Sequence, residues 1–420
     1  MKGHISKRTR KDGGTSWLLK YDAGSDPKTG QRLQRYKTVR GSKKDAERKL
    51  RSLLSHVDKG THVDRNRLTL GDWCETWIRT YKLEKARKTR ERYAELLRLH
   101  VIPKLGSLKL QNVTGDDIQN AYAELLTSGG RRGQGLAART VLHVHRLLSQ
   151  VLAMAAKKRH VPRNAAEDVE APEPKPTEIQ VLDKAQLTML LTGLQGRALY
   201  PLVALAAGTG MRRGELLALR WSDVNLLGQE LSVKRSVEDT AAGGLRFKAP
   251  KSTAGTRDIS LSANLVEVLV QHRKHLTRDA NKCGVKLPDD SLVFPTSVFD
   301  PMTPRHPRAV TKEFGRWVRK MNLPKIGLHC LRHTHATLLL DQKLNPKVVS
   351  KRLGHSTVAI TLEIYAHVTD EANREAAQVA GKILNDALPT LEPAPETDYE
   401  PAAASDSNGG LHSRLQIGHA

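Results

Sequence analysis

Four side chains that could bind or attack a phosphate group lie close together near the end of the chain: His329, Arg332, His355 and Tyr365. The planar guanidinium of arginine binds anionic oxygens in pairs, and imidazole can move a proton or donate a hydrogen bond. The phenol of tyrosine becomes a nucleophile once it loses its proton. These residue types suggest an anion site with its own nucleophile, which is not typical of a helical core.

The spacing of the neighbouring residues predicts three short helices in this stretch. Side chains at positions 331, 335, 338 and 339 recur at helical spacing, and the pattern stops before Asn345 and Pro346, which are typical of an N-cap and a first helical position. His329 and Arg332 then lie three residues apart at the start of the first helix, beside its positive dipole end. An anion would be stabilised there.

The second predicted helix, PKVVSKRL, ends at Gly354, so His355 is expected in a tight connection. Ser356 is expected to cap a third helix, in which Tyr365 follows positions 358 and 362 on one face. By this spacing alone, a core tyrosine is the favoured interpretation of Tyr365.

Two further segments upstream carry cations. Residues 203–221 form an apolar segment, a Gly-Thr-Gly break, and then Arg212 and Glu215 ahead of a second amphipathic helix. Arg212 and Glu215, three residues apart, could simply form a structural ion pair. The segment LRFKAPKSTAGTRDISLS predicts two strands around a polar turn, with Lys251 at the bend, where a lysine is usually just solvated.

Taken together and in this order, these residues resemble the tyrosine recombinase (phage integrase) family. The motifs that carry the resemblance are TGMRRGELLALRW, PKST, LHCLRHTHAT, LGHS and IYAHV. The clear match covers about residues 180 to 370. One departure is Cys330, where many members have aspartate; this position is not one of the family's phosphate contacts.

The resemblance implies a role for each residue in attack on a DNA phosphodiester. Negative charge builds on the non-bridging oxygens, and Arg212 and Arg332 could stabilise it without a metal ion. Glu215 would support these arginines from behind. No cofactor and no ATP are then expected.

By the same resemblance, Tyr365 is the nucleophile, and its phenol, with an ordinary pKa near 10, needs nearby positive charge or a base. His329 would fill the acid/base role and His355 would donate to the phosphate. Lys251 would protonate the departing 5′-oxygen. The family's product is a 3′-phosphotyrosyl link with a free 5′-hydroxyl.

The composition independently indicates a polyanionic partner. The 420 residues contain 69 Lys+Arg against 44 Asp+Glu, for a net charge of +25 and a pI of about 10.0. Such an excess predicts salt-dependent binding to DNA, although a ribosomal or membrane-surface protein could share it. At roughly 150 residues per domain, the length predicts two or three domains.

The cysteines and apolar runs bear on the cellular compartment. The three cysteines lie far apart, which indicates reduced thiols in a cytoplasmic protein: Cys74, Cys283 and Cys330. A zinc site around His329, Cys330, His333 and His335 is not expected, because no second Cys/His pair has finger spacing. No run approaches the roughly 20 apolar residues of a membrane span, and the start MKGHISKRTRKDGG has no hydrophobic signal core.

The chain divides into five predicted segments: an arm-type DNA-binding module at 1–62, a helical core-binding domain at 67–168, a proline-rich linker at 169–180, a catalytic domain at 181–385 and a disordered tail at 386–420.

Residues 1–60 hold 17 Lys+Arg and 6 Asp+Glu, a net charge of +11. Strands are predicted at Trp17–Tyr21 and Arg32–Val39, followed by a helix capped by Ser42. The alternative to a DNA-binding module is a solvated basic appendage.

In the helical domain, caps are expected at Thr69 or Asp72 and at Thr114, and a break is expected at Pro103 and Gly106.

The predicted fold is therefore multidomain, with a small α+β module, an all-α domain and a mainly α catalytic domain with a small antiparallel sheet, as in tyrosine recombinases and type IB topoisomerases. The expected function is a site-specific recombinase that integrates or excises a mobile element. Expected partners are double-stranded DNA attachment sites, a tetramer of the chain itself on DNA, and accessory excision and DNA-bending factors. Alternatives are a DNA-binding regulator without catalysis and a type IB topoisomerase-like enzyme.

Overall fold

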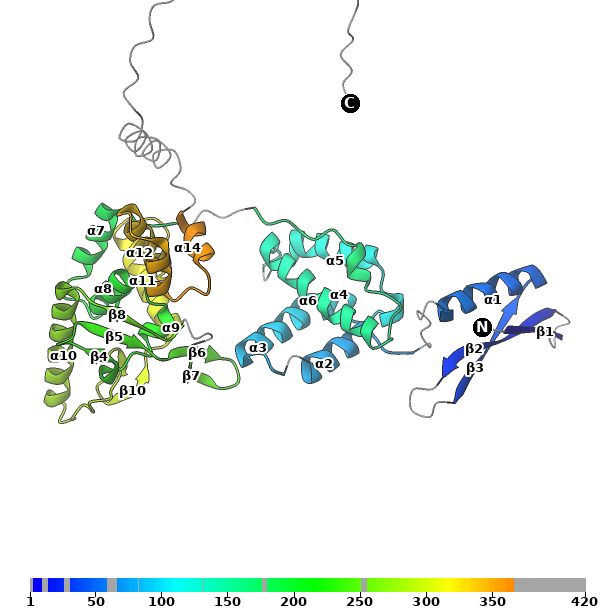
Figure 1. Cartoon of the computed structure of the whole chain (residues 1–420), viewed down its shortest axis with the longest axis horizontal. Helices are drawn as coiled ribbons and strands as arrows, with labels where there is room; N and C mark the ends of the chain where they lie inside the picture. Colours follow the sequence, from blue (N-terminus) through cyan, green and yellow to red (C-terminus); the bar gives the residue numbers. More distant parts are fainter. Residues whose placement is uncertain are drawn as a thin grey trace, which may run out of the picture. The chain divides into compact units, whose positions relative to one another are not determined.

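The structure is a computed structural model, which divides into one unit of residues 1–364 and a second of residues 365–420 (Figure 1). It describes residues 3–9, 14–25, 31–58, 66–81, 83–130, 132–175, 180–250 and 255–365. Lys251, part of the predicted linker and the predicted tail at 386–420 lie outside these residues, as does the side chain of Tyr365. The predicted fold class is confirmed: the chain is mostly helical, with small antiparallel sheets.

The N-terminal part is a three-stranded antiparallel sheet covered by one helix. Its elements are β1 Gly3–Thr9, β2 Thr15–Ser25, β3 Arg32–Arg40 and α1 Lys43–Asp58, with strand order β1-β2-β3. Strand β1 was not predicted, because GHISKRT lacks alternating apolar residues. The predicted cap is confirmed, since the Ser42 hydroxyl accepts from the Asp45 amide at 3.2 Å. Leu19 and Tyr21 of β2 share a core with Leu50 of α1.

The second part is helical. Its elements are α2 Leu70–Thr80, α3 Arg87–Leu96, a π-helical turn Leu97–Val101, α4 Ile102–Leu105, a 3-10 turn Leu110–Asn112, α5 Gly115–Ser128, α6 Ala138–Lys157 and a 3-10 turn Ala165–Asp168. Thr69 and Thr114 each close a capping box with the aspartate three residues later, so both predicted caps are confirmed. Apolar residues of α2, α5 and α6 form one core.

The predicted break at Pro103 is wrong. The backbone stays helical from α3 through the π-helical turn into α4, and this helical stretch ends at Gly106. Within the turn, the Ile102 amide donates to the Leu97 carbonyl, five residues back. A wider turn of this kind accommodates a residue that lacks an amide proton, so the helix continues where an ordinary α-helix would kink.

The third part contains most of the described elements. Its helices are α7 Lys184–Leu194, α8 Tyr200–Thr209, α9 Arg213–Leu216, α10 Ala263–Lys282, α11 Pro307–Lys320, α12 Cys330–Asp341, α13 Pro346–Leu353 and α14 Val358–Tyr365, with a 3-10 turn Trp221–Asp223. Its strands are β4 Val224–Asn225, β5 Glu230–Val233, β6 Ser236–Thr240, β7 Gly244–Lys248, β8 Arg257–Ser260, β9 Pro295–Ser297 and β10 Asp300–Pro304.

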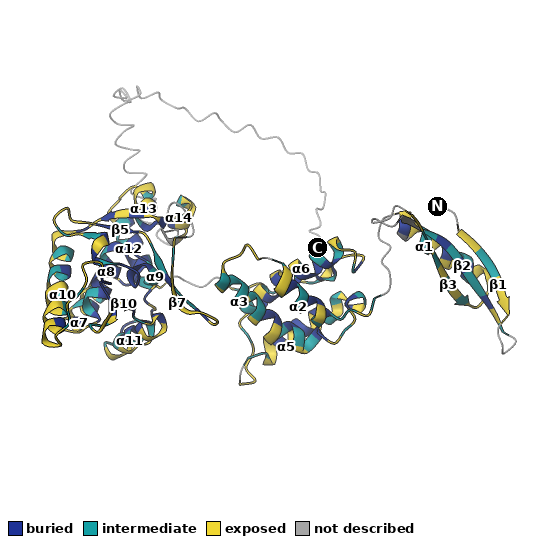
Figure 2. Ribbon diagram, turned by 90° about the horizontal axis from the view of Figure 1, so that it is seen from below, coloured by how far each residue is buried: buried dark blue, intermediate teal, exposed yellow. Residues whose placement is uncertain are grey.

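Helix α8 lies at the centre of this part (Figure 2). Its sequence YPLVALAAGT is apolar on every side, as expected of a helix surrounded by protein, and residues 202–207 are all buried. Leu205 of α8 belongs to the same core as Leu331 of α12. The segment after α8 refines a prediction, because the second helix, predicted after Arg212, is only the four-residue helix α9.

The strands around Lys251 also correct a prediction. Both predicted strands exist, but β7 pairs with β6 and β8 pairs with β5, so they belong to different sheets. Residues 241–243 form a short connection between β6 and β7, and these two strands pair with each other as a hairpin. The segment with Lys251 therefore connects two sheets and is not a hairpin tip.

Helices α12, α13 and α14 follow the predicted order. Helix α13 begins after Asn345, whose side chain accepts from the Lys347 amide at 2.8 Å, and ends at Gly354 in the left-handed conformation with φ 69°. Both ends are as predicted. Helix α14 begins at Val358, one residue later than a Ser356 cap requires. Within the described residues, no helix combines the length and apolar character needed to span a membrane.

Candidate active site

Arg212 stands at the N-cap of α9, two residues after Gly210, whose left-handed φ of 65° ends α8. Its guanidinium donates to the Glu215 carboxylate at 2.9 Å and to the Gly354 carbonyl at 3.1 Å. The side chain is nevertheless 40% exposed. Arg212 is thus fixed from two sides and still accessible to a ligand.

Glu215 is a buried carboxylate that binds two arginines. Besides Arg212, it accepts from Nη2 of Arg257 at 2.9 Å, and both side chains of this second pair are only 5% exposed. Burial acts to raise the pKa of Glu215, but the charge of Arg257 and hydrogen bonds from both arginines outweigh it and lower that pKa. Glu215 is therefore ionised and holds the arginines in place.

Arg257 was not among the residues predicted from the sequence. It begins β8, and its other two donors bind the Arg352 carbonyl at 2.7 Å and the Gly255 carbonyl at 3.1 Å. A signal did exist: in the segment RDIS, Arg257 shares the inward phase of the strand with Ile259. A charged residue at an inward position needs a buried partner, which Glu215 supplies.

Arg332 is the most deeply buried of the predicted cations, with 2% of its surface exposed. Its Nη1 donates to the Gly210 carbonyl at 2.8 Å, whereas its buried Nη2 has no hydrogen-bond partner among the described residues. Burial and the charge of Arg212 lower the pKa of Arg332 to about 9. An unpaired buried donor on a cation is a position where an anionic oxygen would be strongly stabilised.

His329 is the residue immediately before α12. Its ring meets that of His333 edge-on, with centroids 4.9 Å apart. Partial removal of the ring from water, followed by the neighbouring His333, Arg332 and Arg212, lowers the pKa of His329 to about 4, although the residue as a whole is exposed. The ring is thus neutral near pH 7. Cys330, the position that departs from the family pattern, packs partly buried against the main core.

His355 follows Gly354 in the turn between α13 and α14, as predicted. Its amide donates to the Ser350 carbonyl at 3.1 Å, and its Nδ1 lies 2.8 Å from the hydroxyl of Thr361. Burial and the charges of Arg332 and Arg212 lower the pKa of His355 to about 4. Thr361 was not predicted as a site residue; its position one helical turn before Tyr365 was the available signal.

His335 lies beneath this group and is part of its support. Its Nδ1 donates to the Ala207 carbonyl at 2.8 Å, and its Nε2 accepts from Nε of Arg352 at 3.2 Å. Burial and the charge of Arg352 lower the pKa of His335 to about 4. The neutral ring with one donor and one acceptor satisfies both partners.

The structure brings five of the seven predicted site residues together: Arg212, Glu215, His329, Arg332 and His355. Lys251 lies outside the described residues. Tyr365 ends α14, but its side chain is not described. The five residues form a positively charged cluster in which Nη2 of Arg332 is an unused donor, and this combination suits an anion.

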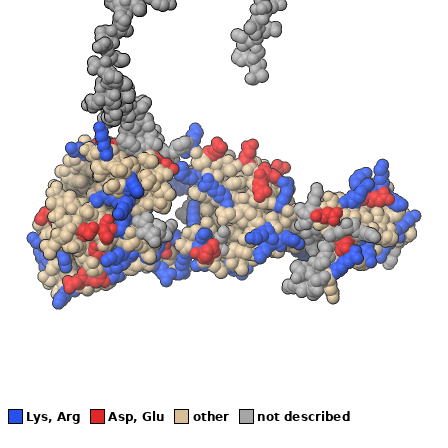
Figure 3. Space-filling view, in the orientation of Figure 1, with Lys and Arg blue, Asp and Glu red and all other residues tan. Residues whose placement is uncertain are grey.

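A cleft of about 490 Å³ opens beside this group, and Arg212 and His329 are among its lining residues. Further cations line it, including Arg213, Lys248 and Arg308, of which the last two pair with the lining carboxylates Glu238 and Asp239. Lys and Arg side chains are plentiful on the surface, as Figure 3 shows.

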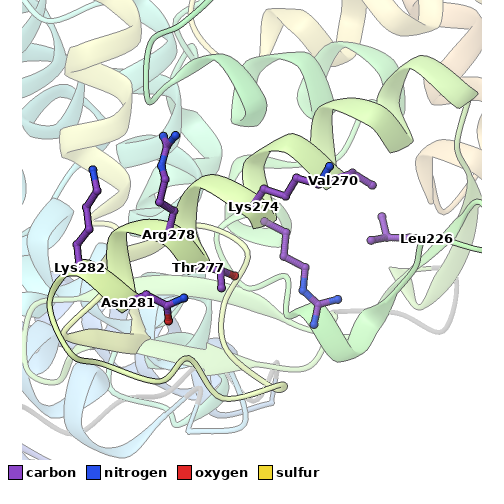
Figure 4. Close-up of a pocket in the computed structure, with 8 residues that line it drawn as sticks. Leu226, Val270, Lys274, Thr277, Arg278, Asn281 and Lys282 are labelled. Atoms are coloured by element: carbon purple, nitrogen blue, oxygen red, sulfur yellow. The ribbon is translucent and has the colours of Figure 1, made fainter.

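A larger hollow of about 730 Å³ lies along α10, lined by Leu226, Val270 and several cations (Figure 4). The side chains of Lys274, Arg278 and Lys282 project from that helix, as Figure 4 shows. None of the five gathered residues lines it. Surface lysines and arginines on one helix face are ordinarily solvated, so this hollow lacks the unpaired buried donor that marks the candidate site.

Two protein-family models match the sequence. The model of the phage integrase family matches residues 180–372, and that of the phage integrase N-terminal SAM-like domain matches residues 69–126. The chain belongs to the tyrosine recombinase (phage integrase) family. The recombinase thus has the predicted membership, and the matched ranges include the five gathered residues.

Curated relatives resemble the recombinase over most of their length. It is 27% identical over 364 residues to a "Tyrosine recombinase XerC-like" protein of Caldanaerobacter subterraneus subsp. tengcongensis, covering 82% of this chain and 90% of that protein. It is 28% identical over 379 residues to an "Integrase" of Streptomyces ambofaciens, covering 86% and 93%.

Solved structures share the fold. The Tn1549 transposon integrase in complex with transposon right end DNA matches with a TM-score of 0.62 and 23% identity, over 74% of this chain and 99% of that one. A lambda integrase tetramer bound to a Holliday junction matches with a TM-score of 0.53 and 16% identity, over 85% and 94%.

The first prediction concerns the buried ion pair between Arg257 and Glu215. Arg257→Met should lower the free energy of unfolding by about 3 kcal/mol, because it leaves the Glu215 charge buried with one partner fewer. Urea denaturation followed by circular dichroism measures this. Arg246→Met, on the exposed β7, is the matched control and should be close to neutral. Equal stability of the two variants would contradict the role assigned to the pair.

A second prediction concerns pH. Folded His335 has a pKa of about 4, whereas an ordinary histidine titrates near 6.5, so the unfolded chain binds more protons between these values. The protein should therefore lose stability as the pH falls from about 6.5 to about 4. In His335→Gln this part of the loss should be missing, which denaturation at several pH values would reveal.

The exposed His143 offers the control for this experiment, and His143→Gln should follow the wild-type curve. A constant stability difference between wild type and His335→Gln across this pH range would contradict the assignment.

Proposed function

We propose that the recombinase cuts and rejoins DNA through a covalent 3′-phosphotyrosine intermediate, with Tyr365 as its nucleophile. The observation that carries this is the unpaired Nη2 of the buried Arg332, next to the half-exposed Arg212 and two neutral imidazoles. A DNA phosphate fits such a pocket, because its two non-bridging oxygens match the paired donors of guanidinium groups. Helix α14, which ends at Tyr365, is tied to His355 through Thr361.

In the proposed reaction, the Tyr365 oxygen forms a bond to phosphorus while the bond from phosphorus to the 5′-oxygen breaks. Arg212 and Arg332 stabilise the charge on the non-bridging oxygens. His329 is neutral near pH 7 and can accept the phenol proton. Lys251 gives a proton to the departing 5′-oxygen, and the reverse steps rejoin a strand without ATP.

His355 has a different task in this scheme. Its pKa of about 4 means that it enters the reaction neutral, so it acts as a hydrogen-bond donor to a phosphate oxygen and not as a third positive charge. Glu215 touches no substrate; its carboxylate keeps Arg212 oriented. No metal ion is needed, since the guanidinium groups already supply the positive charge.

We further propose the division into an arm-type module at 1–62, a core-binding domain at 67–168, a linker at 169–180 and a catalytic domain at 181–385. Three separate apolar cores, within residues 5–57, 68–169 and 182–331, support it.

The N-terminal sheet supports DNA binding by the arm-type module. Leu19 faces α1, and strand alternation places Lys20 on the opposite face, where it lies over the exposed ring of Tyr36 at 5.8 Å. In the strand register, Arg8 and Arg40 both pair with Ser16 on that same open face. A basic face of a small sheet can enter the major groove.

We propose that the partners are DNA attachment sites and other copies of the chain, with four copies on a synapsed site, helped by accessory excision and DNA-bending factors. The lambda integrase structure is a tetramer bound to a Holliday junction, which supports this assembly. The cytoplasm is the proposed compartment, because that is where intracellular DNA of a bacterial mobile element is reached.

A covalent adduct tests the nucleophile. Wild-type protein incubated with supercoiled DNA that carries the flanking sequence of its gene, without metal or ATP, should form a denaturant-resistant protein–DNA adduct. Tyr365→Phe should abolish the adduct and leave DNA binding nearly intact, because only the hydroxyl is lost. Tyr200→Phe in α8 is the matched control and should still form it. Persistence of the adduct in Tyr365→Phe would show that the nucleophile is another residue, and a non-catalytic regulator would give no adduct at all.

Removal of residues 1–60 tests the arm-type module and separates a recombinase from a topoisomerase-like enzyme. The truncated protein should cleave a short core site normally but recombine a full attachment site at least about tenfold more slowly, because the basic contacts are lost. In the intact chain, Arg40→Ala should weaken full-site binding, whereas Lys49→Ala, on the exposed surface of α1, should not. Equal recombination by truncated and intact protein would refute this role.

A further inference from the structure

Thr361 is a fully buried polar residue of α14, with 0% of its surface exposed. Its hydroxyl lies 2.8 Å from Nδ1 of His355, across the turn that joins α13 to α14. Buried hydroxyls bind a partner because an unpaired one costs free energy. This contact is therefore a defined part of the site.

The direction of this hydrogen bond follows from the partners at hand. A hydroxyl proton needs an acceptor, and the one recorded for Thr361 among the described residues is Nδ1 of His355. A neutral imidazole has one bare nitrogen and one protonated nitrogen. If Thr361 donates to Nδ1, that nitrogen is bare and the proton of His355 resides on Nε2.

The environment of His355 agrees with a neutral ring. The positively charged groups that act on it are Arg332, Arg212 and Arg257, which all disfavour a second ring proton. A single proton must then be placed on one of two nitrogens. The Thr361 hydroxyl decides between them, much as a carboxylate partner fixes the tautomer of a catalytic histidine in other enzymes.

The same contact also ties α14 to the active-site turn. Thr361 and Tyr365 are four residues apart on this helix, so they lie on one face about one turn apart. The backbone of the turn is fixed separately, because the His355 amide donates to the Ser350 carbonyl at 3.1 Å. The hydrogen bond from Thr361 therefore links the helix that bears Tyr365 to the imidazole.

We propose that Thr361 is a positioning residue that holds His355 in its Nε2–H tautomer and fixes the position of α14 relative to that imidazole. The proposal rests on the proposed function, since His355 uses this Nε2 proton to donate to the phosphate. Thr361 itself touches no substrate.

Nitrogen-15 NMR of the histidine rings in the full-length protein without DNA tests the tautomer directly. The signals of His355 are assigned by their loss in His355→Gln. The wild-type ring should show a protonated Nε2 and a bare Nδ1. A protonated Nδ1 in the wild-type protein would overturn the proposal without recourse to any variant.

Thr361→Val keeps the shape of the side chain and removes the hydroxyl, so Nδ1–H should become populated. Cleavage of a nicked duplex from the flanking DNA should slow by about tenfold in single-turnover experiments, with DNA affinity unchanged, because the wrong tautomer presents a lone pair to the phosphate. Thr361→Ser restores the hydroxyl and should recover both the spectrum and the rate.

Thr337→Val in α12 is the matched control, because the hydroxyl of Thr337 has no hydrogen-bond partner among the described residues. It should leave the His355 spectrum and the cleavage rate unchanged. If Thr361→Val keeps the wild-type tautomer, or changes it without slowing cleavage, Thr361 is only a packing residue. If Thr361→Val fails to fold, the wild-type tautomer measurement still decides.

The failure of this inference differs from failure of the proposed function. A wild-type protein that never forms an adduct with DNA would contradict the function and leave the tautomer result standing. A wild-type protein that forms the adduct but has Nδ1 protonated would contradict only the role of Thr361.

Discussion

The buried carboxylate of Glu215 is the interaction on which the site depends. It binds the side chain and the backbone amide of Arg212 on one side and Arg257 on the other. Arg257 in turn binds the Arg352 carbonyl, just before the turn that contains His355. One negative charge thereby joins the start of α9, the start of β8 and the end of α13. These elements carry Arg212 and Arg257 and lead into His355, whereas His329 and Arg332 come from the start of α12.

This arrangement brings several positive charges close together. Arg212, Arg257 and Arg332 lie near enough to lower the pKa values of neighbouring groups, and Glu215 neutralises only part of their charge. Such a cluster is held together by the packing of α8 and α12 beneath it. A bound anion would offset the remaining repulsion between these guanidinium groups.

Structural features could be predicted from the sequence where a residue acts only on its immediate neighbours in the chain. Asn345 and Gly354 act on their own few residues, so the ends of α13 were predictable, and so was the position of His355 between helices. The family motifs pointed to five residues that the structure brings together. Arg257 was missed because its partners come from distant segments. The pairing of β7 with β6 and the π-helical turn before Pro103 are local features, and they were missed for another reason: residue propensity encodes neither strand pairing nor a hydrogen bond five residues back.

The separation of β7 and β8 into two sheets has a consequence for how this enzyme can vary. A hairpin loop sets the register of its two strands, so a change in its length disturbs the sheet. The connection from residue 249 to residue 256 carries no such constraint, and the entropic cost of extra residues grows only slowly. Insertions or deletions there would therefore leave the register of both sheets unchanged, while Arg257, at the start of β8, stays anchored to Glu215.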